Sequence, residues 1–178
     1  DGISSVALRF PAVFPVDFST TESYHQRTNT ILKVLAELMS LPEAERTARI
    51  ADTAQRVLAH RQQRPFEYHP DETVSPFKHL YDDPLFGTYI IDRFNFWAYV
   101  DERDSAQSIE KGLLADFEGH HPLFINALPN SLEYYSTTLV KLFFPEVTRW
   151  KRPLSGIESL VSIDKAKSLI GFSPEHTI

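Results

Sequence analysis

The chain has 178 residues, with 24 acidic and 18 strongly basic side chains and a formal net charge of −6. A mildly acidic chain lacks the electrostatic footprint for DNA or anionic lipid, so we expect neither a nucleic-acid nor a membrane partner. The absence of cysteine excludes disulfides, thiolate metal sites and a cysteine nucleophile. No apolar run approaches ~18 residues and no segment resembles a signal peptide, so a cytoplasmic location is the default expectation.

The six glycines are too widely spaced to build a nucleotide-binding turn. They stand at positions 2, 87, 112, 119, 156 and 171, so neither G-x-G-x-x-G nor G-x-x-x-x-G-K occurs. The chain also begins with Asp1, and its only methionine is Met39. We therefore expect it to be a piece of a longer protein.

The first half predicts one strand and two helices. Residues 3–9 have the composition of a buried strand, which Pro11 interrupts. A helical period follows from about residue 21 and places these apolar residues on one face: Tyr24, Ile31, Leu35 and Leu38. Ser40 and Glu43 fit a capping box for a second helix that ends within residues 60–64. Residues 65–96 contain four prolines and are predicted to be irregular.

The second half alternates strands and helices. Short strands are predicted at 97–100 and 123–126, and a helix is predicted over 101–117, ending near Gly119, with this apolar face: Ala106, Ile109, Leu113 and Phe117. Asn130 and Glu133 fit a capping box for a helix that stops at Pro145. A last helix is predicted over 164–170, with Gly171 just after it. This order predicts an α/β fold.

A search for chemical motifs finds no complete catalytic or metal site. His120 and His121 are expected in a solvated loop, and the carboxylates of residues 101–104 are expected to favour the positive end of a helix dipole. The aromatic residues Phe94, Phe96, Trp97 and Tyr99 are predicted to pack partly in the core, with the wall of a small-molecule cleft as the alternative. Arg149 and Arg152 form the most basic point of the chain; they fit either a solvated loop or a phosphate clamp.

Four stretches together resemble a known superfamily. They are VALRFPAVF (6–14), WAYVDERDSA (97–106), PLFIN (122–126) and SIDKAKSLIGFSP (162–174). In this order they resemble the C-terminal half of the extended short-chain dehydrogenase/reductase superfamily, the NAD-dependent epimerase/dehydratase family. The resemblance implies the last strands of a Rossmann-type fold plus a mostly helical, small substrate-binding domain. The Rossmann part would comprise residues 1–15 and 120–144, and the helical part residues 16–119 and 145–178.

The resemblance also implies that the catalytic and main cofactor motifs lie elsewhere. The family's first half carries the glycine-rich NAD(P) turn and a Tyr-x-x-x-Lys pair, and no lysine of this chain has a tyrosine four residues before it. We therefore expect no catalytic residue here, and either a missing N-terminal half or a homo-oligomer that covers the sheet edge. The whole protein would use NAD or NADP for hydride transfer on a small molecule, a nucleotide sugar or a related hydroxylated substrate.

Only a few site residues can be assigned from the resemblance. Phe10 and Pro11 match positions that pack near the nicotinamide, and Ala12, Trp97, Arg149 and Arg152 fall on or near substrate-binding positions; no metal ligand is implied. Ala12 replaces the family's asparagine and Trp97 stands where many members have arginine, which argues against a standard UDP- or dTDP-sugar. The alternative function is a non-catalytic interaction module, in which helices within 21–64 bind a partner protein on a degenerate family core.

Overall fold

The computed structural model describes residues 3–62 and 82–178 and shows a mixed α/β chain with parallel strand pairs. The chain divides into two compact units. Unit 1 comprises residues 1–21, 95–138 and 151–178, and unit 2 comprises residues 22–94 and 139–150. This division does not follow the predicted one, because residues 95–119 and 151–178 group with the first strand.

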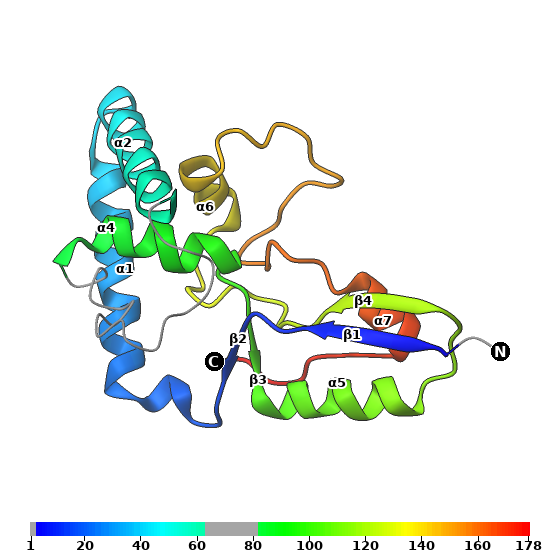
Figure 1. Cartoon of the computed structure of the whole chain (residues 1–178). Helices are drawn as coiled ribbons and strands as arrows, with labels where there is room; N and C mark the ends of the chain where they lie inside the picture. The colour runs from blue at the N-terminus through cyan, green and yellow to red at the C-terminus, as the bar shows by residue number, and fades with distance from the viewer. Residues whose placement is uncertain (1–2, 63–81) are drawn as a thin grey trace. The chain divides into compact units, whose positions relative to one another are not determined.

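Unit 1 contains two parallel strand pairs (Figure 1). β1 (Ser5–Arg9) pairs with β4 (His120–Phe124). The strand predicted at 3–9 is confirmed over residues 5–9, whereas the strand predicted at 123–126 lies three residues too late and overlaps β4 only at residues 123 and 124. β2 (Ala12–Phe14) pairs with β3 (Tyr99–Asp101), so the strand predicted at 97–100 is confirmed in part, over residues 99 and 100. β2 was not predicted, because it lies between two prolines that remove backbone donors. β2 has only three residues, and each of them is paired with one residue of β3.

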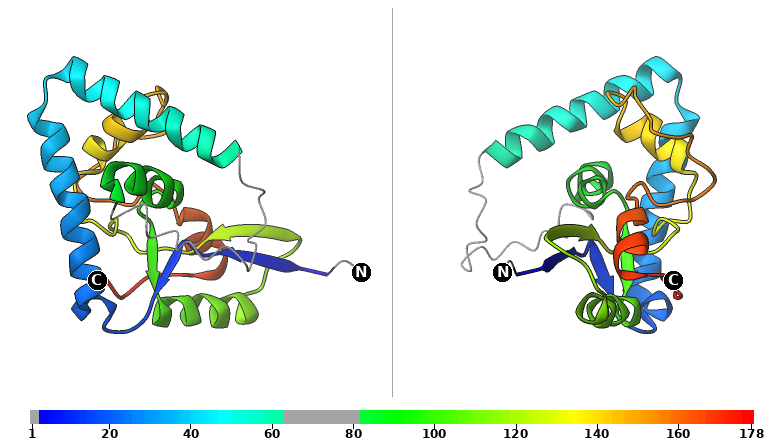
Figure 2. Two further views of the ribbon diagram at one scale, coloured as in Figure 1. Left: turned by 60° about the vertical axis from the view of Figure 1, so that its left-hand side comes forward. Right: turned by 90° about the vertical axis from the view of Figure 1, so that its right-hand side faces the viewer.

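Two helices cover one face of the β1–β4 pair. α5 (Glu102–Leu114) packs on β1 and α7 (Asp164–Ile170) packs on β4, as the ribbon can be followed in Figures 1 and 2. One apolar core joins them, with Val6 and Leu8 packed against it; its fully buried members are Val100, Leu123, Ile125, Ala166 and Phe172. Gly171 follows α7 with φ 69°, so the predicted helix and its glycine stop signal are confirmed.

The predicted inward face of α5 is wrong. The buried residues of this helix are Asp104, Ser105, Ser108 and Gly112, whereas Ile109 and Leu113 are 50% and 81% exposed. A Cβ atom on Gly112 would lie 3.2 Å from Cγ2 of Val6, so the helix approaches β1 through its smallest residue. The close approach of α5 to β1 therefore determines which face of the helix is buried. The apolar residues Ile109 and Leu113 remain exposed on the surface of the helix.

Unit 2 begins with the two predicted helices. α1 (Glu22–Ser40) and α2 (Glu43–Gln62) confirm the expectation, and Ile31, Leu35 and Leu38 of α1 are buried as predicted. In the part of the chain that the structure describes, no helix is long and apolar enough to cross a membrane.

The remaining predictions for residues 65–96 and 130–145 are partly wrong. Residues 65–81 lie outside the described residues, but α4 (Pro84–Gly87), the π-helix η2 (Thr88–Asp92) and the 3-10 helix η3 (Arg93–Asn95) replace the irregular segment. The Asp83 side chain accepts a hydrogen bond from Phe86 N at 3.1 Å, which caps α4. The next predicted helix starts late, because α6 spans Ser136–Phe143 and Glu133 has a left-handed φ of 49°. A 3-10 turn, η1 (Phe18–Thr20), completes the elements of unit 1.

The left-handed residue after α7 gives a stability prediction. Gly171→Ala should lower the free energy of unfolding by about 1 kcal/mol, because a Cβ strains a left-handed backbone although no atom lies within 4 Å of it. Urea titration would measure this loss. Gly171→Asn should cost less than Gly171→Ala, because asparagine tolerates this conformation better; equal losses for both variants would contradict the explanation.

Candidate functional site

The two strand pairs of unit 1 meet at the segment Phe10–Ala12. This segment follows β1 and leads into β2, while the chain after β4 turns toward β3. Ile125 N donates to Arg9 O at 3.1 Å, and Ala127 N donates to Tyr99 O at 2.7 Å. The carboxyl ends of β1 and β4 therefore lie beside the start of the β2–β3 pair. Crevices at the carboxyl ends of parallel strands are common ligand sites.

The structure brings four of the six predicted site residues to this junction. Phe10, Pro11 and Ala12 are partly buried, and Ala12 is paired with Tyr99 in the register of β2 and β3. Trp97 lies two residues before Tyr99, at the same end of that pair. Its side chain is only 1% exposed, its φ is 52°, and its carbonyl accepts a hydrogen bond from Ser131 N at 2.8 Å. Trp97 thus packs in the protein interior, and its contact with a substrate stays a prediction.

The two predicted arginines belong to different units. Arg149 is an exposed residue of unit 2, and Arg152 is an exposed residue of unit 1. Arg152 Nη2 lies 2.6 Å from a carboxylate oxygen of Glu158. The hydrogen bond between them raises the pKa of the Arg152 guanidinium and lowers the pKa of the Glu158 carboxyl. A ligand phosphate on Arg152 would therefore have to compete with this carboxylate.

The loop that carries Glu158 runs along the segment after β4. Glu158 forms an antiparallel bridge with Pro129, and Ser159 N donates to Leu128 O at 2.6 Å. Ser131 N donates a hydrogen bond to Trp97 O, so the segment after β4 and the loop that carries Glu158 lie next to the junction. Arg152 is thereby connected, through Glu158, to the segment after β4.

Two buried asparagines that were not predicted as site residues hold these loops together. Asn126 is 1% exposed, and its Nδ2 donates to Ala127 O at 2.9 Å and to Ser159 Oγ at 3.2 Å. Asn130 is fully buried, and its Nδ2 donates to Ile157 O at 2.9 Å and to Tyr134 O at 2.8 Å. The capping-box prediction for Asn130 is wrong, because its side chain ties together a turn and a distant loop. For Asn126, its position between the apolar residues Ile125 and Ala127 was the available signal.

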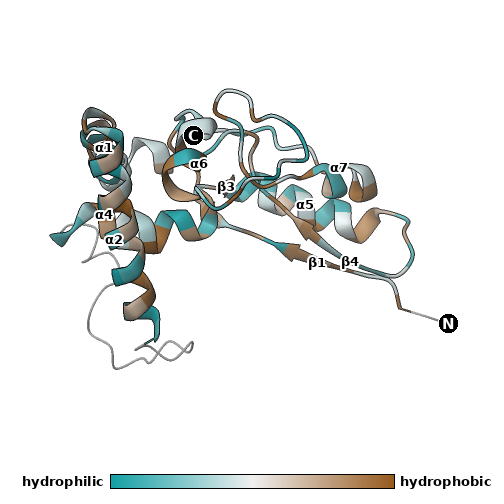
Figure 3. Cartoon of the chain, turned by 90° about the horizontal axis from the view of Figure 1, so that it is seen from above, coloured by the Kyte–Doolittle hydropathy of each residue, from teal (hydrophilic) through white to brown (hydrophobic). Residues whose placement is uncertain are grey.

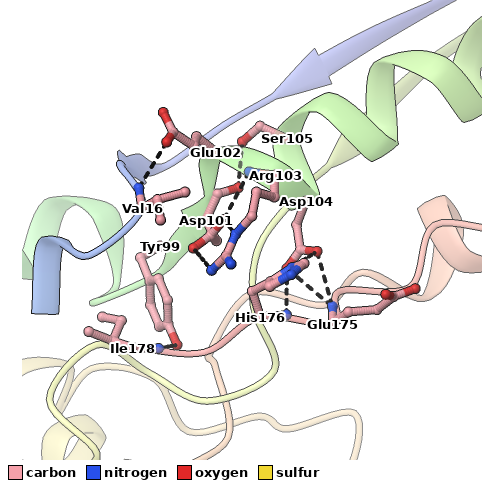
Figure 4. A network of polar contacts seen from close by, with 10 residues as sticks. All are labelled: Val16, Tyr99, Asp101, Glu102, Arg103, Asp104, Ser105, Glu175, His176 and Ile178. Carbon is pink, nitrogen blue, oxygen red and sulfur yellow. Dashed lines mark hydrogen bonds and ion pairs between the residues drawn. The ribbon is translucent and has the colours of Figure 1, made fainter.

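A second polar network lies at the start of α5 and is shown in Figure 4. Asp101 caps the helix, accepting hydrogen bonds from Arg103 N at 2.8 Å and from Arg103 Nε at 2.8 Å. These bonds lower the pKa of the Asp101 carboxyl. The Glu102 carboxylate accepts a hydrogen bond from Val16 N at 2.9 Å. The prediction of favourable carboxylates at the helix start therefore holds for Asp101, but with specific partners.

Asp104 serves a different purpose from the predicted one. Its carboxylate is fully buried and accepts backbone hydrogen bonds from Glu175 N at 3.1 Å and His176 N at 3.0 Å, toward which it points in Figure 4. His176 Nδ1 lies 2.8 Å from the same carboxylate, and Ile178 N donates to Tyr99 Oη at 3.1 Å. This network fixes the last residues against α5 and β3. It also orients the His176 ring, whose side chain is 32% exposed.

The predictions for the two adjacent histidines and for the aromatic residues have mixed outcomes. His120 and His121 start β4, so the predicted solvated loop is wrong; His120 Nδ1 lies 2.7 Å from Ser5 Oγ. The aromatic residues divide: Trp97 and Tyr99 are buried, whereas Phe94 and Phe96 are 60% and 41% exposed. Within the described residues, no group of three or more His, Cys, Asp or Glu side chains could hold a metal ion.

Unit 2 has its own polar cluster around the π-helix. Arg27 of α1 forms an ion pair with Asp92, which is 1% exposed. Arg93 Nε donates to Phe143 O at 2.7 Å, and its guanidinium carbon lies 4.8 Å from the centre of the Tyr89 ring. Burial raises the pKa of Tyr89. These contacts fix η2 to neighbouring segments of unit 2, and the sequence reasoning did not anticipate them.

The buried carboxylate predicts how the last residues are held. Asp104→Asn should lower the free energy of unfolding by about 2–3 kcal/mol, because the backbone donors of two residues lose a charged acceptor. Hydrogen exchange at the amides of Glu175 and His176 should accelerate in the variant. Glu110→Gln, an exposed change on the same helix, serves as the control. Unchanged exchange at residues 175 and 176 would contradict the assigned contacts.

The Asp101–Arg103 contact should make part of this stability depend on pH. The folded pKa of Asp101 is lower than in the unfolded chain, so its stabilisation is present above about pH 4 and is lost as the pH falls through the folded pKa. Asp101→Asn should therefore reduce the free energy of unfolding at neutral pH, and the difference from wild type should shrink toward about pH 2. Urea titrations across this range would measure it, with Asp116→Asn as control; a difference independent of pH would refute the assignment.

Comparison with known proteins gave no relative: a scan against protein-family models, a search of curated proteins and a search of solved structures each found no match. Function must therefore be inferred from the sequence pattern and the geometry of the chain.

Proposed function

We propose that the chain is the substrate-binding part of an NAD(P)-dependent epimerase, dehydratase or reductase that acts on a nucleotide sugar or a related hydroxylated substrate. One observation supports this above all others: the four stretches that resemble the epimerase/dehydratase family pack into a single core. VALRF pairs with PLF as β1 and β4, and AVF pairs with YVD as β2 and β3. This pairing is what the resemblance predicts for these stretches, and it supports the proposal.

The fourth stretch joins the same core. Ile163, Ala166 and Phe172 belong to the buried cluster that also contains Val100 and Leu123. Asp104 belongs to the second stretch. Its carboxylate accepts hydrogen bonds from the backbone amides of Glu175 and His176, which directly follow Pro174, the last residue of the fourth stretch. All four resembling stretches therefore support each other through pairing, packing or buried hydrogen bonds.

The junction at Phe10–Ala12 is the proposed binding position. Phe10 and Pro11 offer a partly buried, apolar surface at the end of β1, which suits the flat ring of a nicotinamide. A bound NAD(P) supplies or accepts the hydride. The dinucleotide phosphates and the acid/base would need groups from another segment of the gene product, because this sequence has no glycine-rich turn and no Tyr-x-x-x-Lys pair. The role proposed for this chain is to bind and orient the substrate.

The decisive test is dinucleotide binding by the product of the complete gene. Isothermal titration calorimetry with NAD⁺, NADH, NADP⁺ and NADPH should show binding of one pair at a single site. The 178-residue chain alone should bind none of them and should not turn over substrate. A complete gene product that binds no dinucleotide would overturn the proposal and favour the interaction-module alternative.

Arg152 gives a sharper prediction for the substrate. If its guanidinium holds a substrate phosphate, Arg152→Ala should weaken binding of UDP-glucose or dTDP-glucose, used as probes, by about 10–100-fold. Glu158→Gln should strengthen the same binding, because it removes the charge that competes for Arg152 while keeping an acceptor oxygen for Ser155 N. Binding of the dinucleotide should not change in either variant.

The change Arg46→Ala, at a partly buried residue of α2, is the control for general loss of positive charge. Calorimetric titrations of wild type and the three variants would supply the comparison. An equal loss in Arg46→Ala, or weaker binding in Glu158→Gln, would contradict a specific phosphate contact at Arg152.

A further inference from the structure

Arg61, in the last turn of α2, holds its guanidinium against an aromatic ring. Its Cζ atom lies 3.6 Å from the centre of the Phe94 ring, and Phe94 is itself 60% exposed. The end of α2 is hydrophilic, as the teal ribbon there shows in Figure 3. A guanidinium that stacks on a ring keeps its N–H donors at its edge. Among the described residues, no acceptor or carboxylate uses these donors of Arg61.

Arg93 is fixed in place by four contacts. Its Nε donates to Phe143 O at 2.7 Å, and its Nη2 donates to a Glu146 carboxylate oxygen at 2.9 Å. Its Cζ atom lies 4.8 Å from the centre of the Tyr89 ring and 4.5 Å from that of Phe144. A guanidinium has five N–H donors, so most of those of Arg93 remain for another acceptor. Its side chain is 25% exposed, which leaves it open to a ligand from solvent.

The π-helix η2 determines where Arg93 and Phe94 lie. Arg93 N donates to the carbonyl of Thr88, five residues earlier, which is the hydrogen bond of a π turn. Such turns are rare and are frequently found at functional sites. η2 packs against α2, and Phe94 directly follows Arg93 in η3. The ring that holds Arg61 and the second guanidinium therefore come from one short segment.

The two guanidiniums carry more positive charge than their described surroundings neutralise. Burial and, after it, the charge of Arg93 lower the pKa of the Arg61 guanidinium. Glu146 pairs with Arg93, so one of the two charges keeps no described carboxylate. A basic residue in the last turn of a helix favours the helix dipole, and this accounts for Arg61 by itself. It does not account for a second guanidinium placed where the two repel each other.

These contacts indicate an anion site. We propose that Arg61 and Arg93 bind a phosphate group, either as the free ion or as part of a small organic molecule. Guanidinium groups bind phosphate oxygens through paired, charge-assisted hydrogen bonds, for which both arginines have donors left. The exposed ring of Phe94 offers an apolar surface to the rest of an organic ligand. The net charge of −6 argues against a polyanion such as a nucleic acid.

This site goes beyond the proposed function. All of its residues belong to unit 2, and it shares none with the junction at residues 10–12 of unit 1. It uses neither the dinucleotide nor the proposed reaction, so the two proposals fail separately.

A nuclear magnetic resonance titration of the 178-residue chain tests the site directly. Sodium phosphate, added at neutral pH and low salt, should shift the Nε–H signals of Arg61 and Arg93 along one saturable curve. The Nε–H signal of Arg49, an exposed arginine of the same helix, should not follow that curve. Absence of a saturable shift at Arg61 and Arg93 would overturn the proposal.

Substitutions separate a phosphate contact from general charge. Arg61→Gln should weaken phosphate binding by about 10-fold or more, and Arg61→Lys should lose less, because it keeps the charge without the paired donors. Glu146→Gln should strengthen binding, because it removes the competing charge and keeps an acceptor for Arg93 Nη2. Arg49→Gln, the matched control, should change binding by less than about twofold. Equal losses in Arg49→Gln and Arg61→Gln would contradict the assigned site.

Phenyl phosphate distinguishes the two sources of the phosphate group. Tighter binding of phenyl phosphate than of inorganic phosphate would assign the site to a phosphorylated organic molecule, with the ring on Phe94. Equal affinities would assign it to the free ion, and both results uphold the two arginines as the site. A chain in which neither ligand shifts the Arg61 and Arg93 signals would refute the site, whatever the complete gene product binds at the junction.

Discussion

The parallel ladder between β1 and β4 is the constraint on which unit 1 depends. Ser5 and His120 are paired although they are 115 positions apart in the sequence. Parallel strands cannot be joined by a tight turn, so the chain between them has to return to the starting end of the pair. The β2–β3 pair and α5 complete this return, and α7 closes the core over Leu123. Pairing at such a separation carries a loop-closure cost, which the burial of this core offsets.

The same constraint explains which structural predictions succeed. The helices at 22–40, 43–62 and 164–170 are marked by local signals: period, caps and a glycine stop, which do not depend on distant partners. β2 could not be predicted because its strand conformation depends on β3. The face of α5 could not be predicted because its apolar period and its small residues point to different flanks. A Cβ atom added to Gly112 would lie 3.2 Å from Val6 Cγ2, so the close approach to β1 favours the face that carries the small residues.

The candidate site follows the same rule. Residues 10–12 come close to Trp97 through the register of β2 with β3, which sequence spacing alone does not contain. Arg149 and Arg152 are near neighbours in sequence, yet they belong to different compact units. Asn130 has the spacing of a helix cap, but its amide contacts Ile157, 27 positions away. The local pattern therefore identified Asn130 as a residue whose side chain forms hydrogen bonds, but it predicted the wrong partner for that side chain.

The polar groups of unit 1 are used mainly to hold its loops and its last residues in place. Asp104 binds the backbone of Glu175 and His176, Asp101 binds Arg103, and Glu158 binds Arg152 and the Ser155 amide. The hydrogen bonds from Arg103 and Arg152 lower the pKa values of the Asp101 and Glu158 carboxyls, which makes these two groups poor proton donors near neutral pH. The junction itself offers an apolar surface, backbone groups and a small residue, Ala12. A surface of that kind would select a ligand by shape, so in the proposed enzyme the reacting groups would have to come from outside the polar contacts described here.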